Sequence, residues 1–318
     1  MNGKITVFGA GNVGGAVTRR LIERKLCKTV VLVDRNAEKA EGVALDILEA
    51  SPVDLLEPVC ISGEDIEQTR DSEIVIITAG ATRKEGMSRD DLLKINASIV
   101  SDCVAKSSKY SPYAFYIVVS NPLNVMCHVA MRAGQLPRTR IAGMAGILDS
   151  CRFQYFISKE LGVSVENVQA MVLGEHGEDM IPVPRYSTVA GIPVTELMDA
   201  AKLESLIGRT RDGGAEIIRL MQTSAYYAPA SAVVQMVAAV TMNKKKILPC
   251  AAYLSGEYGI CDAFVGVPVK LGANGVEEVV QIELTDEQRR ALHRSAEKIK
   301  SQLALIGETC RGDGLDQK

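Results

Sequence analysis

The apolar and polar residues of this chain follow two periods in turn. Short apolar runs rich in β-branched residues are typical of buried parallel strands. Between them, apolar residues recur every three or four positions, as in amphipathic helices. This alternation predicts a sheet with helical crossovers. The predicted strands are residues 4–8, 29–33, 58–61, 74–78, 114–119 and 140–142, with a helix at 90–107 among the crossovers.

The second half of the chain predicts more helix. One helix is expected from residue 148 to about 161, and the last begins at Thr285 with Gln288 as its capping partner. The apolar stretch at 228–240 is interrupted by proline and polar residues, so it predicts a buried helix rather than a membrane span. Residues 269–275 have the composition of a hairpin turn, and we expect the flanking strands to form a separate small sheet.

A glycine-rich turn follows the first predicted strand. It reads Gly9-Ala10-Gly11-Asn12-Val13-Gly14. The first glycine makes a tight turn, the second admits a pyrophosphate, and the third lets helix and strand pack closely. Asp34 ends the next strand, at the distance expected for a carboxylate on the adenosine ribose. It favours NAD over NADP, although Arg35 beside it weakens that preference.

Strand, glycine turn, helix, strand and acid in this order predict the fold class. We expect an α/β chain with an N-terminal Rossmann doubly wound parallel sheet and a C-terminal α+β substrate domain. A length of 318 residues accommodates two domains. The expected boundaries are 1–143 for the NAD-binding domain and 144–318 for the catalytic domain.

His176 is the leading candidate for proton transfer, and the chain has only three histidines. It lies between two glycines and two acids, which is typical of a general acid/base, although a loop histidine without chemistry is the alternative. Asp149 and Arg152 are three positions apart and so share one face of a predicted helix. They form either a surface ion pair or, beside His176, an orienting carboxylate and a carboxylate-binding guanidinium. With a hydride cofactor, these residues predict a 2-hydroxy acid dehydrogenase.

Two polar segments follow predicted strands at the edge where ligands bind in such sheets. The loop after 74–78 contains Arg83 and Arg89, and we expect it to act as a mobile lid; a solvated charged loop is the alternative. The segment Ser120-Asn121-Pro122 follows the strand that ends at Val119.

Composition excludes other classes of function. A net charge of −3 and the absence of tryptophan argue against binding to nucleic acid. The eight cysteines form no Cys-x-x-Cys pair, which favours a reducing compartment over a disulfide frame or a zinc site. No signal peptide is expected, so the expected location is the cytoplasm, without membrane attachment.

Taken together, these motifs resemble the lactate/malate dehydrogenase family over nearly the whole chain, and most closely its lactate-dehydrogenase-like malate dehydrogenases of bacteria and archaea. The resemblance implies that His176 exchanges the hydroxyl proton and that Asp149 orients it. It implies that Arg152 binds the C1 carboxylate and that Arg89 polarises the reacting carbonyl. The other residues it implies are Asn121, in contact with substrate and cofactor, and Asn96, Val119 and Ser120 at the NAD site.

Arg83 falls where the family's lactate enzymes typically carry glutamine and its malate enzymes arginine. Oxaloacetate brings a second carboxylate, and burying it unpaired would be unfavourable by several kcal/mol. Ala225 also matches the malate type. The resemblance therefore implies a reversible NAD-dependent oxidation of (S)-malate to oxaloacetate, a place in the tricarboxylic acid cycle, a small-molecule substrate as partner, and a homotetramer or homodimer.

Three alternatives stay open from the sequence. In the same class, the chain is an L-lactate or broad 2-keto-acid dehydrogenase. An NAD-dependent glycosidase shares such a nucleotide domain but uses a metal-binding cysteine and histidine. A non-catalytic NAD-binding sensor is the third, although every expected catalytic position is filled.

Overall fold

The N-terminal half of the protein builds a parallel sheet in the strand order expected of a doubly wound fold. The computed structural model describes residues 3–57, 59–82, 86–177 and 179–307. The strands follow the order β3-β2-β1-β4-β5-β6, and all neighbouring pairs are parallel. They are β1 (Lys4–Phe8), β2 (Thr29–Val33), β3 (Val59–Gly63), β4 (Ser72–Ile77), β5 (Phe115–Val118) and β6 (Ile141–Gly143). The six strands predicted from the sequence are therefore confirmed.

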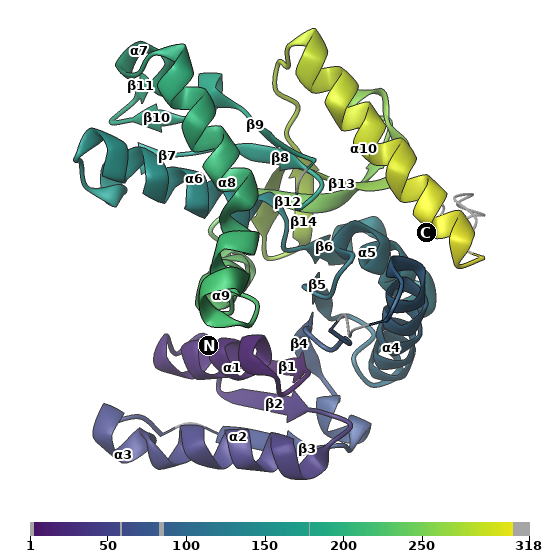
Figure 1. Ribbon diagram of the computed structural model, residues 1–318. Helices are drawn as coiled ribbons and strands as arrows, with labels where there is room; N and C mark the ends of the chain where they lie inside the picture. Colours follow the sequence, from purple (N-terminus) through teal and green to yellow (C-terminus); the bar gives the residue numbers. More distant parts are fainter. Residues whose placement is uncertain (1–2, 58, 83–85, 178, 308–318) are drawn as a thin grey trace.

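Helices cover both faces of this sheet (Figure 1). On one face α4 packs against α5, and on the other α1 packs against α9 from the second half of the chain. The helices of the first half are α1 (Asn12–Glu23), α2 (Ala37–Glu49), α3 (Ser51–Asp54), α4 (Arg89–Tyr110) and α5 (Leu123–Gly134). Because both faces are covered, the central strands β1, β2, β4 and β5 are buried along most of their length rather than at alternate positions.

The second half combines long helices with antiparallel strands. Its helices are α6 (Gly146–Leu161), α7 (Val194–Leu197), α8 (Ala200–Met221), α9 (Tyr227–Thr241) and α10 (Asp286–Leu305). Its strands are β7 (Val168–Gln169), β8 (Val172–Gly174), β9 (Met180–Pro182), β10 (Thr188–Val189), β11 (Ile192–Pro193), β12 (Lys246–Ser255), β13 (Cys261–Gly272) and β14 (Gly275–Val279). The helix predicted to begin at Thr285 is confirmed, with Thr285 and Gln288 forming a capping box.

The expectation of a separate small sheet around residues 269–275 is wrong. The hairpin itself forms, since β13 pairs with β14, but β12 joins β6 through Ala251 and Gly143 and continues the parallel sheet. Within the described residues, the result is one sheet of 11 strands that runs across the expected domain boundary at residue 143. The small separate sheet is instead β11-β10-β7.

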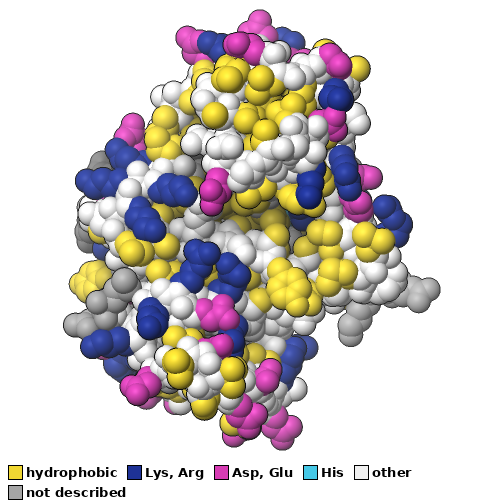
Figure 2. All heavy atoms as spheres, turned by 90° about the vertical axis from the view of Figure 1, so that its left-hand side faces the viewer, with side chains coloured by type: hydrophobic (Ala, Val, Ile, Leu, Met, Phe, Trp, Pro, Cys, Tyr) yellow, Lys and Arg dark blue, Asp and Glu magenta, His cyan; other side chains and the backbone are white. Residues whose placement is uncertain are grey.

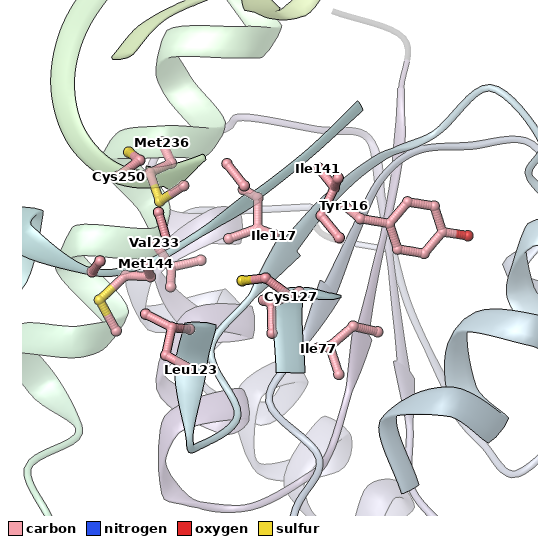
Figure 3. Packing of buried hydrophobic residues seen from close by; sticks show 14 of the residues in the cluster. Ile77, Tyr116, Ile117, Leu123, Cys127, Ile141, Met144, Val233, Met236 and Cys250 are labelled. Atoms are coloured by element: carbon pink, nitrogen blue, oxygen red, sulfur yellow. The ribbon is translucent and has the colours of Figure 1, made fainter. Parts of the chain in front are cut away.

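The two halves share one apolar core at this junction. Figure 3 shows Ile117 of β5 and Cys127 of α5 near Val233 and Met236 of α9 and Cys250 of β12. All five side chains are fully buried. Because the halves are joined by a continuous sheet and a continuous core, the carboxyl ends of β1, β4 and β5 keep a fixed position relative to α6 and β8. No helix in the described ranges has the length and apolar character needed to cross a membrane.

Candidate functional site

The turn between β1 and α1 has the geometry of a dinucleotide site. A Cβ on Gly14 would lie 1.8 Å from the carbonyl oxygen of Gly9, so α1 begins this close to β1 only because residue 14 is glycine. Among the described residues, no atom lies within 4 Å of the position that a Cβ on Gly11 would take. No side chain caps α1, whose first residues are Asn12 and Val13. Free N–H groups facing open space fit a pyrophosphate.

Asp34 is held beside this turn by the backbone. Its Oδ2 accepts a hydrogen bond of 2.7 Å from the N–H of Ala10, and its Oδ1 accepts one of 3.0 Å from the N–H of Asn36. The carboxylate is half-buried at the end of β2. It thus lies next to the glycine turn, as the ribose contact predicted from the sequence requires.

Asn96 joins the loops that follow β4 and β5. Its Oδ1 accepts a hydrogen bond of 2.7 Å from the N–H of Ala81, and its Nδ2 donates one of 2.7 Å to the carbonyl of Asn121. Ser120 adds a second tie, donating to the carbonyl of Ala79 at 2.6 Å. Asn96 and Ser120 are buried, Val119 is half-buried and Asn121 is exposed. The predicted NAD residues of these loops are therefore clustered, and the side chains of Asn96 and Ser120 hold the loops together.

The structure brings the three residues of the predicted catalytic group into contact. Nδ1 of His176 lies 2.9 Å from Oδ2 of Asp149, and Nη1 of Arg152 lies 3.3 Å from its Oδ1. Asp149 is 1% exposed and His176 24% exposed. An ionised carboxylate can only accept, so the Nδ1–H of His176 donates a hydrogen bond to Asp149 and Nε2 is left for a substrate. The alternative of a plain surface ion pair between Asp149 and Arg152 is excluded by this burial.

Helix α6, which carries Asp149, and strand β8, which leads into the loop with His176, approach each other unusually closely. A Cβ on Gly146 would lie 2.0 Å from the carbonyl oxygen of Val172, and the hydroxyl of Ser150 accepts a 3.0 Å hydrogen bond from the N–H of Val172. Neither residue was among the sequence candidates. Their small size in this part of the helix is the sequence signal that could have indicated a close approach.

Only part of the hydrogen-bonding capacity of Arg152 is satisfied by other described residues. Its side chain is 12% exposed, and its Nε has no hydrogen-bond partner among the described residues. It packs against α8, where a Cβ on Gly213 would lie 3.1 Å from the Cδ of Arg152. A buried guanidinium with unpaired donors is unfavourable unless something pairs with them, and a carboxylate matches their geometry.

The structure describes only one of the two arginines predicted in the loop after β4, Arg89. Arg89 is exposed at the first position of α4 and has no hydrogen bond to another described site residue. A capping box between Ser88 and Asp91 starts this helix, and the hydrogen bond from the Ser88 side chain lowers the pKa of Asp91. Arg83 lies outside the described residues.

Figure 2 shows the left-hand face of Figure 1, where a hollow separates an upper and a lower part of the molecule. Several Lys and Arg side chains lie beside this hollow. The positive charge of these side chains favours the binding of anionic ligands such as dinucleotides and carboxylates. A buried Asp–His pair in a chain whose sheet edge fits a dinucleotide indicates the class of NAD-dependent dehydrogenases.

Comparison with known proteins places the chain within that class. Residues 3–143 match the lactate/malate dehydrogenase NAD binding domain, and residues 147–309 match the alpha/beta C-terminal domain of the same family. The chain therefore belongs to the lactate/malate dehydrogenase family, and its cofactor is NAD.

Relatives of known name are similar along almost their whole length. A malate dehydrogenase of Thermomicrobium roseum is 48% identical over 94% of this chain and 97% of its own length. The solved malate dehydrogenase of Salinibacter ruber is 46% identical with a TM-score of 0.91, covering 96% of this chain and 97% of that one. A minor L-lactate dehydrogenase of Enterococcus mundtii has a TM-score of 0.92 at 30% identity, covering 98% of this chain and 99% of that one. The backbone alone therefore does not separate the two substrates.

Proposed function

We propose that this chain catalyses the reversible NAD-dependent oxidation of (S)-malate to oxaloacetate. The observation that carries the proposal is the buried Asp149–His176 pair with the partly unpaired Arg152 beside it. The curated relatives at 45–50% identity, which are named malate dehydrogenase, support malate as the substrate.

His176 transfers the proton of this reaction, and Asp149 orients His176. In the oxidation, Nε2 of His176 takes the proton of the substrate hydroxyl as the C2–O bond becomes a carbonyl, and in the reduction it returns that proton. NAD, held by the glycine turn and the loops tied by Asn96, would supply the acceptor for the hydride of C2. Asp149 accepts from Nδ1, so it fixes the tautomer and stabilises the imidazolium that forms.

Arginines bind the substrate in this proposal. Arg152 pairs with the C1 carboxylate through the exposed part of its guanidinium, and Arg89 polarises the carbonyl. Arg83 pairs with the second carboxylate, an assignment that rests on its sequence position. Asn121 contacts both substrate and cofactor.

The cofactor is held along the carboxyl edge of the sheet. The glycine turn receives the pyrophosphate, Asp34 the adenosine ribose, and the loops tied by Asn96 the nicotinamide end. The residues proposed to contact NAD are Gly9, Ala10, Gly11, Asn12, Val13, Gly14, Asp34, Asn96, Val119, Ser120 and Asn121.

The proposed function extends to the roles of the two halves of the chain, its location and its oligomeric state. Residues 1–143 serve as the NAD-binding unit and residues 144–318 as the substrate unit, in a cytoplasmic enzyme of the tricarboxylic acid cycle. A homotetramer or homodimer is supported by large apolar side chains exposed near the end of α8 and the start of α9, namely Ile218, Leu220, Met221 and Tyr227.

The direct test is NADH formation from (S)-malate and NAD by the purified protein. His176→Gln should lower kcat by about 10²–10⁴-fold, because the proton acceptor is lost. His293→Gln is the matched control, since His293 is on α10 and bonds the carbonyl of Tyr258. A protein that binds NADH but turns over no hydroxy or keto acid would be a sensor, and the proposal would be wrong.

A further inference from the structure

A lysine of the C-terminal helix contacts the hairpin that carries His176. Nζ of Lys298, on α10, lies 3.0 Å from Oε2 of Glu175 and donates a hydrogen bond to Oδ2 of Asp179. Glu175 follows β8 and directly precedes His176, and Asp179 directly precedes β9, so the two carboxylates lie at the two ends of the loop that joins the arms of the β8–β9 hairpin. One cation therefore ties both arms of the hairpin to α10.

Antiparallel pairing holds β8 to β9 as far as Gly174 and Met180, and His176 lies in the loop beyond this last pair. Gly174 and Gly177, on either side of His176, have φ angles of +83° and +123°, and glycine adds backbone freedom at such positions. The backbone tie between the arms near the tip is a 3.2 Å hydrogen bond from the N–H of Met180 to the carbonyl of Gly177. Asp149 holds the imidazole from the side of α6, and Lys298 holds the hairpin from the side of α10.

The charge of Lys298 also acts on this hairpin. Burial by itself lowers the pKa of Lys298, but the hydrogen bond to Asp179 and the negative charges of Asp179 and Glu175 outweigh it, so the pKa lies above its ordinary value. The side chain of Glu175 is only 14% exposed, so its carboxylate is mostly removed from water and depends on that cation.

Other charged groups surround the same region. A cavity of about 580 Å³ borders Lys298 between α8, β9 and α10, and its charged lining makes the surroundings electrically mixed. Among the described residues, Asp149 and Arg152 of α6 lie at His176, and Lys298 contacts Glu175 and Asp179. The charged residues that line the cavity with Lys298 are Asp179, Glu204 and Arg211 of α8, and Glu287 and Arg294 of α10. Solvent in such an open cavity screens charges, so the influence of Lys298 on the imidazole is moderate in size.

We propose that Lys298 is a positioning residue for proton transfer: it fixes the hairpin that presents His176 and neutralises the carboxylates on either side of it. This inference rests on the proposed function, in which His176 exchanges the substrate proton. In malate oxidation His176 must begin neutral. Uncompensated carboxylates at Glu175 and Asp179 would favour the imidazolium and shift oxidation to higher pH.

The test compares pH–rate profiles for malate oxidation in wild type and in Lys298→Met. The midpoint of the variant's profile should move up by about half a pH unit, which is roughly a threefold loss of rate below the midpoint. Lys298→Arg keeps the cation and should restore the wild-type midpoint. Lys300→Met is the matched control, because Lys300 pairs with Glu297 on the same helix at 3.2 Å and should leave the profile unchanged.

The opposite charge change gives a sign test. Asp179→Asn removes one carboxylate while Lys298 keeps Glu175 as partner, so the midpoint should move down. This variant also keeps the inference testable if Lys298→Met does not fold. A fall in rate without any shift of midpoint in either variant would make Lys298 merely structural and overturn the inference.

Nuclear magnetic resonance separates this inference from the proposed function. With three histidines in the chain, the imidazole signals of His176 can be assigned by His176→Gln and followed with pH in the absence of substrate. An upward shift in Lys298→Met supports the inference even if malate is not the substrate. An unchanged titration of His176 alongside normal malate oxidation overturns the inference and leaves the proposed function standing.

Discussion

The Nδ1 atom of His176 lies 2.9 Å from Oδ2 of Asp149, although 27 positions separate the two residues in the chain. Asp149 lies on helix α6, and His176 lies in the loop of the β8–β9 hairpin, which belongs to the 11-stranded sheet. Their contact depends on the close approach of Gly146 to β8 and on the hydrogen bond between Ser150 and Val172. A rigid approach of this kind fixes the imidazole before any substrate arrives, as general acid/base catalysis requires.

Asp149→Asn should lower kcat for malate oxidation by about 10²–10⁴-fold, because an amide no longer selects the tautomer of His176 or stabilises its charged form. Steady-state kinetics with saturating NAD measure the effect. Asp102→Asn is the control, since Asp102 pairs with Lys106 on the surface of α4 and should leave kcat unchanged. A loss below threefold for Asp149→Asn would contradict an orienting role.

Arg152→Lys should lower kcat/KM by about 10–100-fold, because an ammonium cannot make the paired hydrogen bonds of a guanidinium to a carboxylate. Affinity for NADH should stay within about twofold, since Arg152 is assigned to the substrate alone. NADH fluorescence is well suited to this measurement because the chain has no tryptophan. An equal loss of NADH affinity would show that the substitution disturbs the fold instead.

Gly14→Ala should lower the free energy of unfolding by about 1–3 kcal/mol and weaken NADH binding at least about tenfold, because its methyl group would meet the carbonyl oxygen of Gly9. Gly42→Ala, in the exposed middle of α2 with open space around it, should instead raise the free energy of unfolding by about 0.5–1 kcal/mol. Urea denaturation and NADH titration of both variants make the comparison. Equal changes in the free energy of unfolding and in NADH affinity for the two variants would contradict the steric argument for Gly14.

Stability should fall in mild acid because of His128. Burial, followed by the nearby charge of Arg132, lowers the pKa of His128 to about 4 from about 6.5. The unfolded chain therefore binds this proton more readily than the folded one. Its contribution, about 3 kcal/mol at most, is fully present above pH 6.5, is lost as pH falls toward 4, and changes no further below that.

The measurement for His128 is the free energy of unfolding between pH 7 and pH 4 in wild type and in His128→Leu. The difference between the two proteins isolates this residue from carboxylates that titrate in the same range. The wild type should lose more stability than the variant across that interval. Parallel curves would show that His128 contributes nothing to the acid sensitivity.

The local parts of this fold were predictable from the sequence, and the reasons are physical. The glycine turn with Asp34 and the capping box at Thr285 depend on residues close together in the chain. The hairpin of β13 and β14 was also expected. Its place in the main sheet was not, because the pairing of β12 with β6 depends on contacts between Ala251 and Gly143, more than a hundred positions apart.

The candidate site divides in the same way. Residue types and spacing predicted His176, Asp149 and Arg152 as a group, but the burial that distinguishes this group from a surface ion pair is a property of the folded chain. The tie made by Lys298 has no local signal, since its partners lie on a hairpin more than a hundred positions earlier. Asn96 was expected near the cofactor, and its role in joining two loops emerged only from the structure.

In the proposed function, the preference for oxaloacetate over pyruvate depends on Arg83. The most direct test is the ratio of kcat/KM for oxaloacetate to that for pyruvate, with NADH, in wild type and in Arg83→Gln. Wild type should favour oxaloacetate by at least about a hundredfold, because a buried second carboxylate needs a cationic partner, and Arg83→Gln should lower the ratio by about tenfold or more. Faster turnover of pyruvate by the wild-type protein would contradict the account.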